Sequence, residues 1–325
     1  MSSLHRLLLA GVLFLLSSCH SSNDNSGQPG KVPVIAFIDY VEDATLAQAR
    51  MGFMDALNKA GFSEEKHNIK VIYRNAQGDQ PTLLQTVDYV ISQQPVLIAT
   101  NTTLATVNTV QRTHDIPVFM MVAPRPDIAG LTDKEGHAPS NLYGVYETLD
   151  YIDTAVTLIH SLFPNAKKAG TIYSQSESQS VDALNRLRTG CEKLGISLVE
   201  MPVTNSSETQ LITQSLLAKD IDVFFALPDN VIFSSFETIA RACEEKQVPV
   251  LTSEAGLVAR GALASYGADM YQWGYQSGVQ AAIFLGTGKT DSLKPEIVTV
   301  RTRIMKKSAA ALYLSKPDSL FTLVP

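Results

Sequence analysis

The sequence predicts an α/β protein built from two doubly wound parallel-sheet lobes that are joined by a hinge. Residues 96–122 give a short apolar run, a polar turn, a helical stretch and a second apolar run. This order is typical of a βαβ unit in a buried parallel sheet. Residues 223–251 repeat it, so the chain holds two similar halves. Two such halves, each with a polar turn after a central strand, indicate one ligand held between two lobes.

The pattern of apolar residues predicts the other elements of the first lobe. A helix is expected over 45–60, where apolar residues share one face and Gly61 stands at the position of a C-terminal cap. Pro81 is expected to open a second helix that runs to residue 93, because proline is favoured in the first turn. The expected strands of this lobe are 34–38, 69–73, 96–99, 116–121 and 142–146.

The second lobe is expected to continue the alternation. Its predicted strands are 169–173, 196–201, 223–226, 248–251, 262–267 and 297–303, and its predicted helices are 151–163, 181–194, 207–218 and 231–246. A helix over 269–285 contains Gly274 and Gly278, which permit close packing. With chain crossings near Tyr146 and Gly267, the first lobe is predicted to comprise 32–146 plus about 268–290, and the second 147–267 plus about 291–325.

Composition excludes some classes of partner. The 325 residues are 45% hydrophobic and 18% charged, which is enough apolar material for two cores. The formal net charge is −6, and no basic stripe with interleaved aromatic residues is present. We therefore expect no nucleic-acid partner.

The first eighteen residues have the pattern of an export signal. A cationic start precedes the apolar run Leu7–Leu16, which is too short to span a bilayer, since a membrane helix needs ~20 residues. Leu16-Ser17-Ser18-Cys19 resembles a bacterial lipoprotein signal, in which Cys19 would carry the lipid; the alternative is a plain secretory signal. Residues 19–31 are rich in Ser, Asn, Gly and Pro, which predicts a flexible tether. The expected location is extracytoplasmic, anchored by lipid to a bacterial membrane.

The two cysteines of the expected fold are Cys191 and Cys243. Export would permit a disulfide between them. They fall in helices after the first and third strands of the second half, however, and right-handed crossovers place those helices on opposite faces of the sheet. Two buried free thiols are the expected state.

Catalytic motifs are absent from the sequence. It contains no G-x-S-x-G, H-E-x-x-H, C-x-x-C or G-x-G-x-x-G pattern. Gly288-Lys289-Thr290 imitates the end of a phosphate loop, but Ile283 stands where the first glycine would have to be. The six histidines include no i, i+4 pair, so no metal site is expected. We predict a protein that is not an enzyme and carries no cofactor.

The candidate ligand contacts lie in the loops that follow strands, because ligands of open α/β sheets bind beyond the carboxyl ends of the strands. A turn made of Thr100, Asn101 and Thr102 offers hydroxyls, an amide and a helix N-terminus, which suit a carboxylate. Asp229 and Asn230 follow the equivalent strand and could receive an ammonium group. In both places the alternative is an ordinary helix N-cap.

Further candidates lie around the same predicted cleft. The loop 174–180 is almost wholly polar and is too polar for a core turn, although simple solvation would also explain it. Glu147 and Glu177 are alternative partners for an ammonium group. The remaining predicted contacts are Tyr40, Tyr146, Ser174, Glu177, Ser178 and Ser253.

Several segments together resemble a known family. Gly52-Phe53 and Gly61-Phe62, Leu97 to Thr100, Ile172-Tyr173-Ser174, Pro228-Asp229-Asn230 and above all residues 253–274 follow its order and spacing. The pattern is similar to the substrate-binding lipoproteins of ABC transporters with the type I periplasmic-binding-protein fold. The branch in question includes tryptophan-, tyrosine- and phenylalanine-binding members. Members often carry Glu-His where this chain has Glu42-Asp43, and Tyr-Asn where it has Tyr173-Ser174.

This resemblance implies a function for the two lobes. They would close as a Venus-flytrap on a small solute, with amino acids as the leading class and aromatic ones among them, and present it to an ABC permease in the membrane. The protein would act as a monomer anchored at Cys19. Two alternatives remain open at this point: a ligand-sensing lipoprotein that signals to a membrane receptor, and a binding protein for a sugar or nucleoside-like solute.

Overall fold

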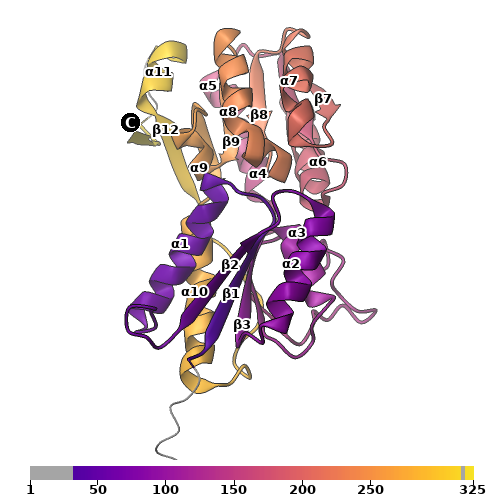
Figure 1. Ribbon diagram of the computed structural model, residues 1–325. Helices are drawn as coiled ribbons and strands as arrows, with labels where there is room; N and C mark the ends of the chain where they lie inside the picture. The colour runs from indigo at the N-terminus through magenta and orange to yellow at the C-terminus, as the bar shows by residue number, and fades with distance from the viewer. Residues whose placement is uncertain (1–31, 316–318) are drawn as a thin grey trace, which may run out of the picture. The chain divides into compact units, whose positions relative to one another are not determined.

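Two β-sheets organise the computed structural model, which describes residues 32–315 and 319–325 (Figure 1). The predicted signal peptide (1–18), the tether (19–31) and Cys19 lie outside the described residues. Residues Val32–Pro325 form one compact unit. In the described residues no helix is both long enough and apolar enough to cross a membrane.

The first sheet contains six parallel strands in the order β11-β5-β4-β3-β1-β2. These strands are Val34–Asp39 (β1), Lys70–Asn75 (β2), Leu97–Asn101 (β3), Val118–Val122 (β4), Leu142–Tyr146 (β5) and Glu296–Ile297 (β11). The helices of this lobe are Ala44–Lys59 (α1), Gln80–Ser92 (α2), Thr103–Val110 (α3) and Met270–Thr287 (α10). The central strands β1, β3 and β4 are almost fully buried, as expected where helices cover both faces.

The second sheet has seven strands in the order β13-β12-β10-β9-β8-β6-β7, and all neighbours are parallel except β10 and β12. Its strands are Lys168–Tyr173 (β6), Ser197–Pro202 (β7), Val223–Ala226 (β8), Val250–Glu254 (β9), Ala264–Ala268 (β10), Thr302–Lys306 (β12) and Thr322–Val324 (β13). The fold class predicted from the sequence, α/β with two parallel-sheet lobes, is thereby confirmed.

The helices of the second lobe surround this sheet. They are Tyr151–Ala155 (α4), Thr157–Leu162 (α5), Ser178–Lys193 (α6), the short 3₁₀ turn Ser206–Glu208 (η1), Thr209–Leu217 (α7), Asn230–Glu245 (α8), Ala255–Ala259 (α9) and Lys307–Tyr313 (α11). Cys191 in α6 and Cys243 in α8 are buried and free, as expected from their positions on separate helices.

The chain crosses between the sheets three times. It crosses after β5, after β10 and again between β11 and β12. The sequence analysis expected one strand over 297–303 and a return to the second lobe at about residue 291. Instead, Ile297 ends a strand of the first sheet and Thr302 begins a strand of the second. β-branched residues favour an extended conformation in either sheet. The residue types in this stretch therefore do not indicate where the chain passes from one sheet to the other.

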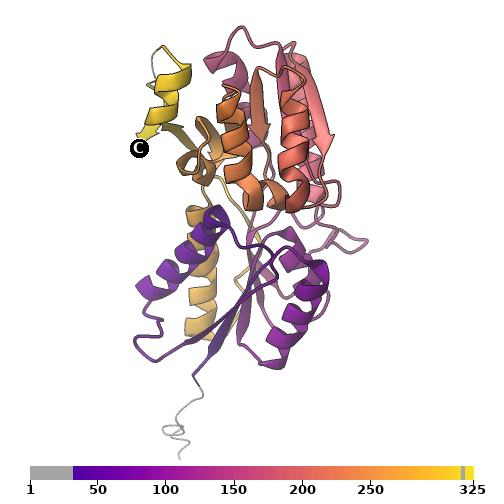
Figure 2. The same cartoon turned by 45° about the horizontal axis from the view of Figure 1, so that its top comes forward.

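Helix α10 packs along α1, although the two are more than 200 positions apart in the sequence, and both views show them side by side (Figures 1 and 2). Glycines make this approach possible. A Cβ atom on Gly274 would lie 1.7 Å from the carbonyl oxygen of Ala49, and one on Gly52 would lie 2.0 Å from that of Tyr271. This packing ties α10 to the first lobe and places its first turn beside the crossing that follows β10.

Candidate ligand-binding site

Two neighbouring cavities are lined by residues of both lobes at the carboxyl ends of the strands. The polar cavity has a volume of about 180 Å³, and its lining includes Tyr40, Glu42 and Gln77 of the first lobe and Ser174, Glu177 and Asn230 of the second. The apolar cavity has a volume of about 20 Å³ and is lined by Leu46, Thr102, Thr103, Val122, Ala123, Glu147, Tyr151, Gln179, Pro228, Asn230, Phe233, Met270 and Trp273. Asn230 lines both. Both volumes are below the roughly 300–1,000 Å³ of typical ligand pockets, so neither cavity has room for a ligand of that size in this structure.

The walls of the apolar cavity suit a hydrocarbon or aromatic group. Trp273 lies in the first turn of α10 and is only 1% exposed. The ring of Tyr151 meets its indole edge-on, with 6.3 Å between ring centroids. Phe233 from α8 and Leu46 from α1 also line the cavity, one from each lobe.

Three buried polar atoms in this lining have no hydrogen-bond partner in the structure. They are Oγ1 of Thr102, Oε1 of Gln179 and Nε1 of Trp273. Buried polar groups are usually paired, so these three atoms are available as hydrogen-bond partners for a molecule in the cavity. Thr102 also has a backbone φ of 86°, a left-handed conformation that is uncommon outside glycine and that gathers at functional sites.

Glu147 places a carboxyl group in the same lining. It follows β5 at the first crossing, and its Oε2 accepts a hydrogen bond of 2.9 Å from the backbone N–H of Leu149. Burial, and to a smaller degree the neighbouring Glu254, raise the pKa of Glu147 well above its ordinary value. Leu149 has a φ of 56°, so the crossing is also held in a left-handed turn. A cation in the cavity would therefore meet a desolvated carboxyl group.

A second buried acid stands behind Tyr151. The hydroxyl of Tyr151 donates a hydrogen bond of 3.0 Å to Oε1 of Glu254, while Oε2 of Glu254 has no partner. Burial raises the pKa of Glu254 to about 8. The Arg301 guanidinium lies 4.5 Å from the centroid of the Tyr151 ring and partly opposes this rise in pKa. Tyr151 therefore connects the cavity wall to a buried acid with a raised pKa.

Four predicted contacts line the polar cavity: Tyr40, Ser174, Glu177 and Asn230. Glu177 is the acid among them, and burial followed by the nearby Asp229 raises its pKa to about 8. Its Oε2 accepts hydrogen bonds of 3.2 and 3.0 Å from the backbone and side-chain nitrogens of Asn230. Of the predicted carboxylate-binding turn, Thr102 is the member that lines the apolar cavity.

Asp229, which was predicted as an ammonium partner, bonds to the surrounding scaffold in the structure. Its Oδ1 caps α8 by accepting hydrogen bonds from the backbone N–H groups of Val231 (2.8 Å) and Ile232 (3.1 Å). Its Oδ2 accepts from the backbone N–H of Ser174 (2.7 Å) and from Oγ of Ser180 (2.6 Å). The carboxylate is fully buried, and these bonds occupy both oxygens. The helix-cap alternative accounts for Asp229 better than ammonium binding does.

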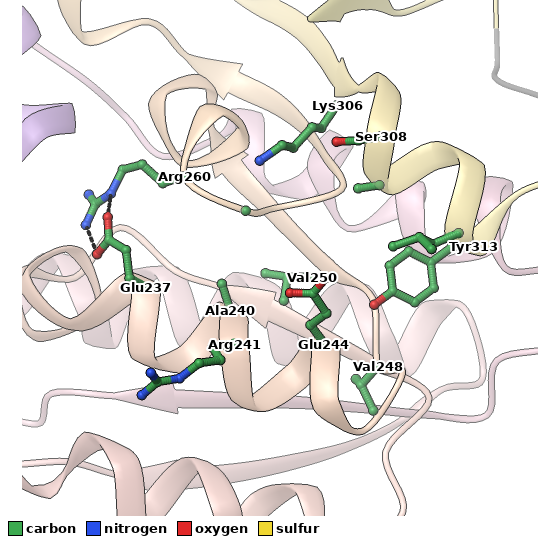
Figure 3. Close-up of a pocket in the computed structure, with 13 residues that line it drawn as sticks. Glu237, Ala240, Arg241, Glu244, Val248, Val250, Arg260, Lys306, Ser308 and Tyr313 are labelled. Atoms are coloured by element: carbon green, nitrogen blue, oxygen red, sulfur yellow. Dashed lines mark hydrogen bonds and ion pairs between the residues drawn. The ribbon is translucent and has the colours of Figure 1, made fainter. Parts of the chain in front are cut away.

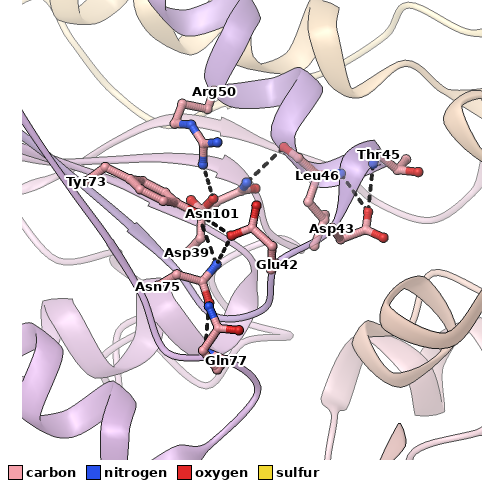
Figure 4. A network of polar contacts seen from close by, with 10 residues as sticks. All are labelled: Asp39, Glu42, Asp43, Thr45, Leu46, Arg50, Tyr73, Asn75, Gln77 and Asn101. Carbon is pink, nitrogen blue, oxygen red and sulfur yellow. Dashed lines mark hydrogen bonds and ion pairs between the residues drawn. The ribbon is translucent and has the colours of Figure 1, made fainter.

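The remaining predicted residues belong to the scaffold around the cavities, and none of them lines either cavity in the described part of the chain. Thr100 pairs through its hydroxyl with Thr106 (2.9 Å). Asn101 donates from its amide to the carbonyl oxygen of Leu46 (2.9 Å), which fixes the first turn of α1 (Figure 4). The hydroxyl of Ser253 donates a hydrogen bond to Glu254. Ser178 is exposed, and Tyr146 is half-buried.

The sequence analysis missed Trp273, Tyr151 and Gln179 as site residues. Trp273 could have been identified, because it is the single tryptophan of the chain and stands six positions after the predicted crossing at Gly267. Tyr151 likewise follows the first crossing within a few residues. Gln179 lies within the polar loop that was singled out, but its residue type gave no reason to prefer it over its neighbours.

One group of possible metal ligands occurs in the described residues. Asp133, Glu135 and His137 have ligand atoms within 4.8 Å of one another, and all three are exposed. The Asp133 carboxylate already accepts hydrogen bonds from the backbone N–H groups of Glu135 and His137. None of the three lines the cavities described above.

Fold and site together define a two-lobed solute-binding protein. Paired α/β lobes, crossings between them and a cavity with orphaned polar atoms form a site suited to holding a molecule, and the family to which the chain belongs consists of binding proteins rather than enzymes. The chain belongs to the ABC transporter substrate-binding protein family, whose model matches residues 31–323. The resemblance drawn from the sequence is thus confirmed.

Individual relatives agree with this assignment. A tyrosine-binding protein of Clostridioides difficile (strain R20291) is 33% identical over 293 residues, which are 87% of this chain and 84% of the relative. A conserved domain protein from Vibrio cholerae has a solved structure with a TM-score of 0.82 and 29% identity, covering 90% of this chain and 99% of that one. An ABC domain from Streptococcus pneumoniae, solved with L-Trp, has a TM-score of 0.80 and 23% identity, covering 89% and 97% of the two chains. As in other members of the family, the ligand is a small solute, the partner is a membrane permease and the protein acts outside the cytoplasm.

Proposed function

We propose that this protein is the solute-binding component of an ABC importer for an amino acid, with aromatic amino acids as the leading candidates. Its lobes would close on the solute and present it to the permease. Cys19 would carry the lipid that keeps the protein, as a monomer, at the membrane. The proposed amino-acid ligand is supported by the name of the C. difficile relative, a tyrosine-binding protein, and by the residues that line the apolar cavity.

The observation that carries the proposal is the composition of the apolar cavity. An α-amino acid needs a partner for its ammonium group, donors for its carboxylate and, when its side chain is apolar, a dry wall. Glu147 is a buried acid in the lining. Thr102 offers an unpaired hydroxyl just before α3, where backbone N–H groups and the helix dipole favour an anion. Trp273 and Tyr151 form the wall.

Closure follows from the same arrangement. The polar groups of the cavity come from both lobes, so a solute can satisfy all of them only when the lobes are together. A ligand shifts a conformational equilibrium by its difference in affinity for the two states. Binding at this cavity would therefore favour the closed form over the open one.

A thermal-shift screen of residues 32–325 tests the proposal. The panel contains aromatic, aliphatic and charged amino acids, sugars and nucleosides. A ligand at a hundred times its Kd stabilises the protein by ~2.7 kcal/mol, which raises the unfolding temperature by several degrees. We expect a rise with L-tyrosine, L-tryptophan or L-phenylalanine. A rise confined to sugars or nucleosides would overturn the amino-acid assignment.

A further inference from the structure

Arg260 joins the two lobes beside the apolar cavity. It caps the end of α9 in the second lobe, where its Nε and Nη2 donate to the two carboxylate oxygens of Glu237 at 2.7 and 2.8 Å (Figure 3). Its Nη1 reaches the first lobe, donating to Asp43 and, at 3.1 Å, to the hydroxyl of Thr45. The same guanidinium therefore binds acids of both lobes.

The groups that Arg260 holds belong to segments that form the cavity wall. Asp43 also caps α1, because its Oδ1 accepts from the backbone N–H groups of Thr45 and Leu46 (Figure 4). Leu46 lines the apolar cavity from the first lobe. On the other side, Nη2 of Arg260 donates at 2.7 Å to the carbonyl oxygen of Phe233, whose residue lines the cavity from the second lobe.

A second contact beside this ion pair shows that the two surfaces are shaped for each other. Gly256 in α9 faces Thr45, and a Cβ atom on Gly256 would lie 2.4 Å from Cγ2 of Thr45. Only glycine allows α9 to come this close to the start of α1. Thr45 of the first lobe is therefore contacted both by the Arg260 guanidinium and by Gly256.

We infer that Arg260 is a positioning residue for solute binding, which holds the Leu46 and Phe233 walls of the apolar cavity together across the two lobes. The inference rests on the proposed function, since it assumes that a solute occupies this cavity. The pair between Arg260 and Asp43 is well shielded: their side chains are 12% and 1% exposed. Truncating one partner of such a pair leaves the other charge buried, unlike the loss of a surface pair.

The chain offers a matched control for a test. Arg188 makes a 2.8 Å ion pair with Glu200, and both residues lie in the second lobe. Arg188→Gln removes an ion pair within the second lobe, whereas Arg260→Gln removes one pair within that lobe, with Glu237, and one between the lobes, with Asp43. Asp43→Asn keeps an oxygen to cap α1 while it removes the charge that meets Arg260.

The experiment measures the Kd of the aromatic amino acid that binds wild-type protein, together with the radius of gyration of the ligand-free protein by small-angle X-ray scattering. We expect Arg260→Gln to weaken binding roughly tenfold and to enlarge the ligand-free radius of gyration. We expect Arg188→Gln to change the affinity less than about twofold. The double variant of Arg260→Gln and Asp43→Asn should be little worse than Arg260→Gln alone, because the two residues act through one contact.

An unchanged Kd and an unchanged radius of gyration in Arg260→Gln would overturn the inference and leave the proposed function intact. Equal losses of affinity in Arg260→Gln and Arg188→Gln would also overturn it, since a general loss of stability would then explain both. If no amino acid binds wild-type protein, the proposed function fails, and the scattering of the ligand-free variants still decides whether Arg260 holds the lobes together.

Discussion

Buried acids dominate the site at the scale of single residues. Glu147 lines the apolar cavity, Glu177 lines the polar cavity, and Glu254 supports Tyr151 from behind. Burial is the largest cause of the raised pKa of each. A neutral carboxyl can be kept in a dry site at little cost, and it becomes an anion when a cation arrives to pair with it.

Glu147→Gln tests the proposal that Glu147 receives the ammonium group of an amino-acid ligand. Glutamine keeps the size and the acceptor oxygen but cannot form an ion pair, so we expect the Kd for the bound amino acid to rise more than ~tenfold. Isothermal titration calorimetry measures the change. Glu135→Gln, at an exposed position, serves as the control. Unchanged affinity in Glu147→Gln would remove this residue from the binding site.

Glu254 gives the ligand-free protein a pH-dependent stability. Its native pKa of about 8 lies above its ordinary value of 4.5, so the folded protein binds more protons than the unfolded chain between these values. The stabilisation is complete below the unfolded pKa and is lost as the pH rises through the folded pKa.

We expect the unfolding temperature to fall from about pH 5 to about pH 8 and to fall less steeply in Glu254→Gln. The slope should not vanish in this variant, because burial raises the pKa of Glu147 and Glu177 in the same direction. Thermal unfolding followed by circular dichroism across this range measures both slopes. Identical slopes in wild type and Glu254→Gln would contradict the raised pKa of Glu254.

The residue types in the sequence predicted the location of the site. They were a poorer guide to the individual side chains that line it. The strand ends after β3 and β8 do lie at the cavities, and Thr102 and Asn230 line them. Asn101 and Asp229 occupy the same turns but bond to the scaffold. Helix N-caps and ligand contacts use the same residue types. The two roles can therefore be told apart only from the hydrogen bonds that the side chains make in the folded structure.

At the scale of elements, the contact between α1 and α10 builds the first lobe from two ends of the chain. Gly52 of α1 and Gly274 and Gly278 of α10 lie in this contact, and their missing side chains let the backbones come close together. The sequence analysis expected close packing at Gly274 and Gly278, and the structure confirms it. The partner helix could not be predicted, because periodicity marks a contact face but not what it contacts.

Gly274→Ala should destabilise the protein, because its Cβ atom would lie 1.7 Å from the backbone oxygen of Ala49. Moving the helices apart is expected to cost about 1–3 kcal/mol or more. Gly286→Ala in the same helix is the matched control, since nothing lies within 4 Å of a Cβ atom there. Alanine should be neutral or mildly stabilising at that position. Equal unfolding free energies in urea for the two variants would contradict the close approach of α1 and α10.

The third crossing between the sheets could not be predicted from the sequence. The sequence analysis treated 297–303 as one strand, whereas the chain leaves the first sheet at Ile297 and enters the second at Thr302. The two ends of this stretch pair with β5 and β10, which are distant in sequence. Such long-range pairing leaves no local pattern, while the βαβ units that were predicted depend on local alternation.

At the scale of the whole molecule, three crossings connect two lobes that share one set of cavities. Glu147 lies in the first crossing and Trp273 just after the second, so two groups of the apolar cavity come from the segments that must bend when the lobes part. Arg301 in the third crossing stacks on Tyr151. Binding and bending therefore involve neighbouring residues, which is the arrangement that couples ligand binding to domain closure.

A crystal structure of residues 32–325 grown with the amino acid selected by the screen tests the central claim most directly. The account predicts that the amino acid occupies the apolar cavity, with its ammonium group within hydrogen-bond distance of Glu147. Its carboxylate should lie at Thr102 and the start of α3, and its side chain should lie against Trp273. An amino acid bound outside this cavity, or bound inside it with its ammonium group away from Glu147, would contradict the account.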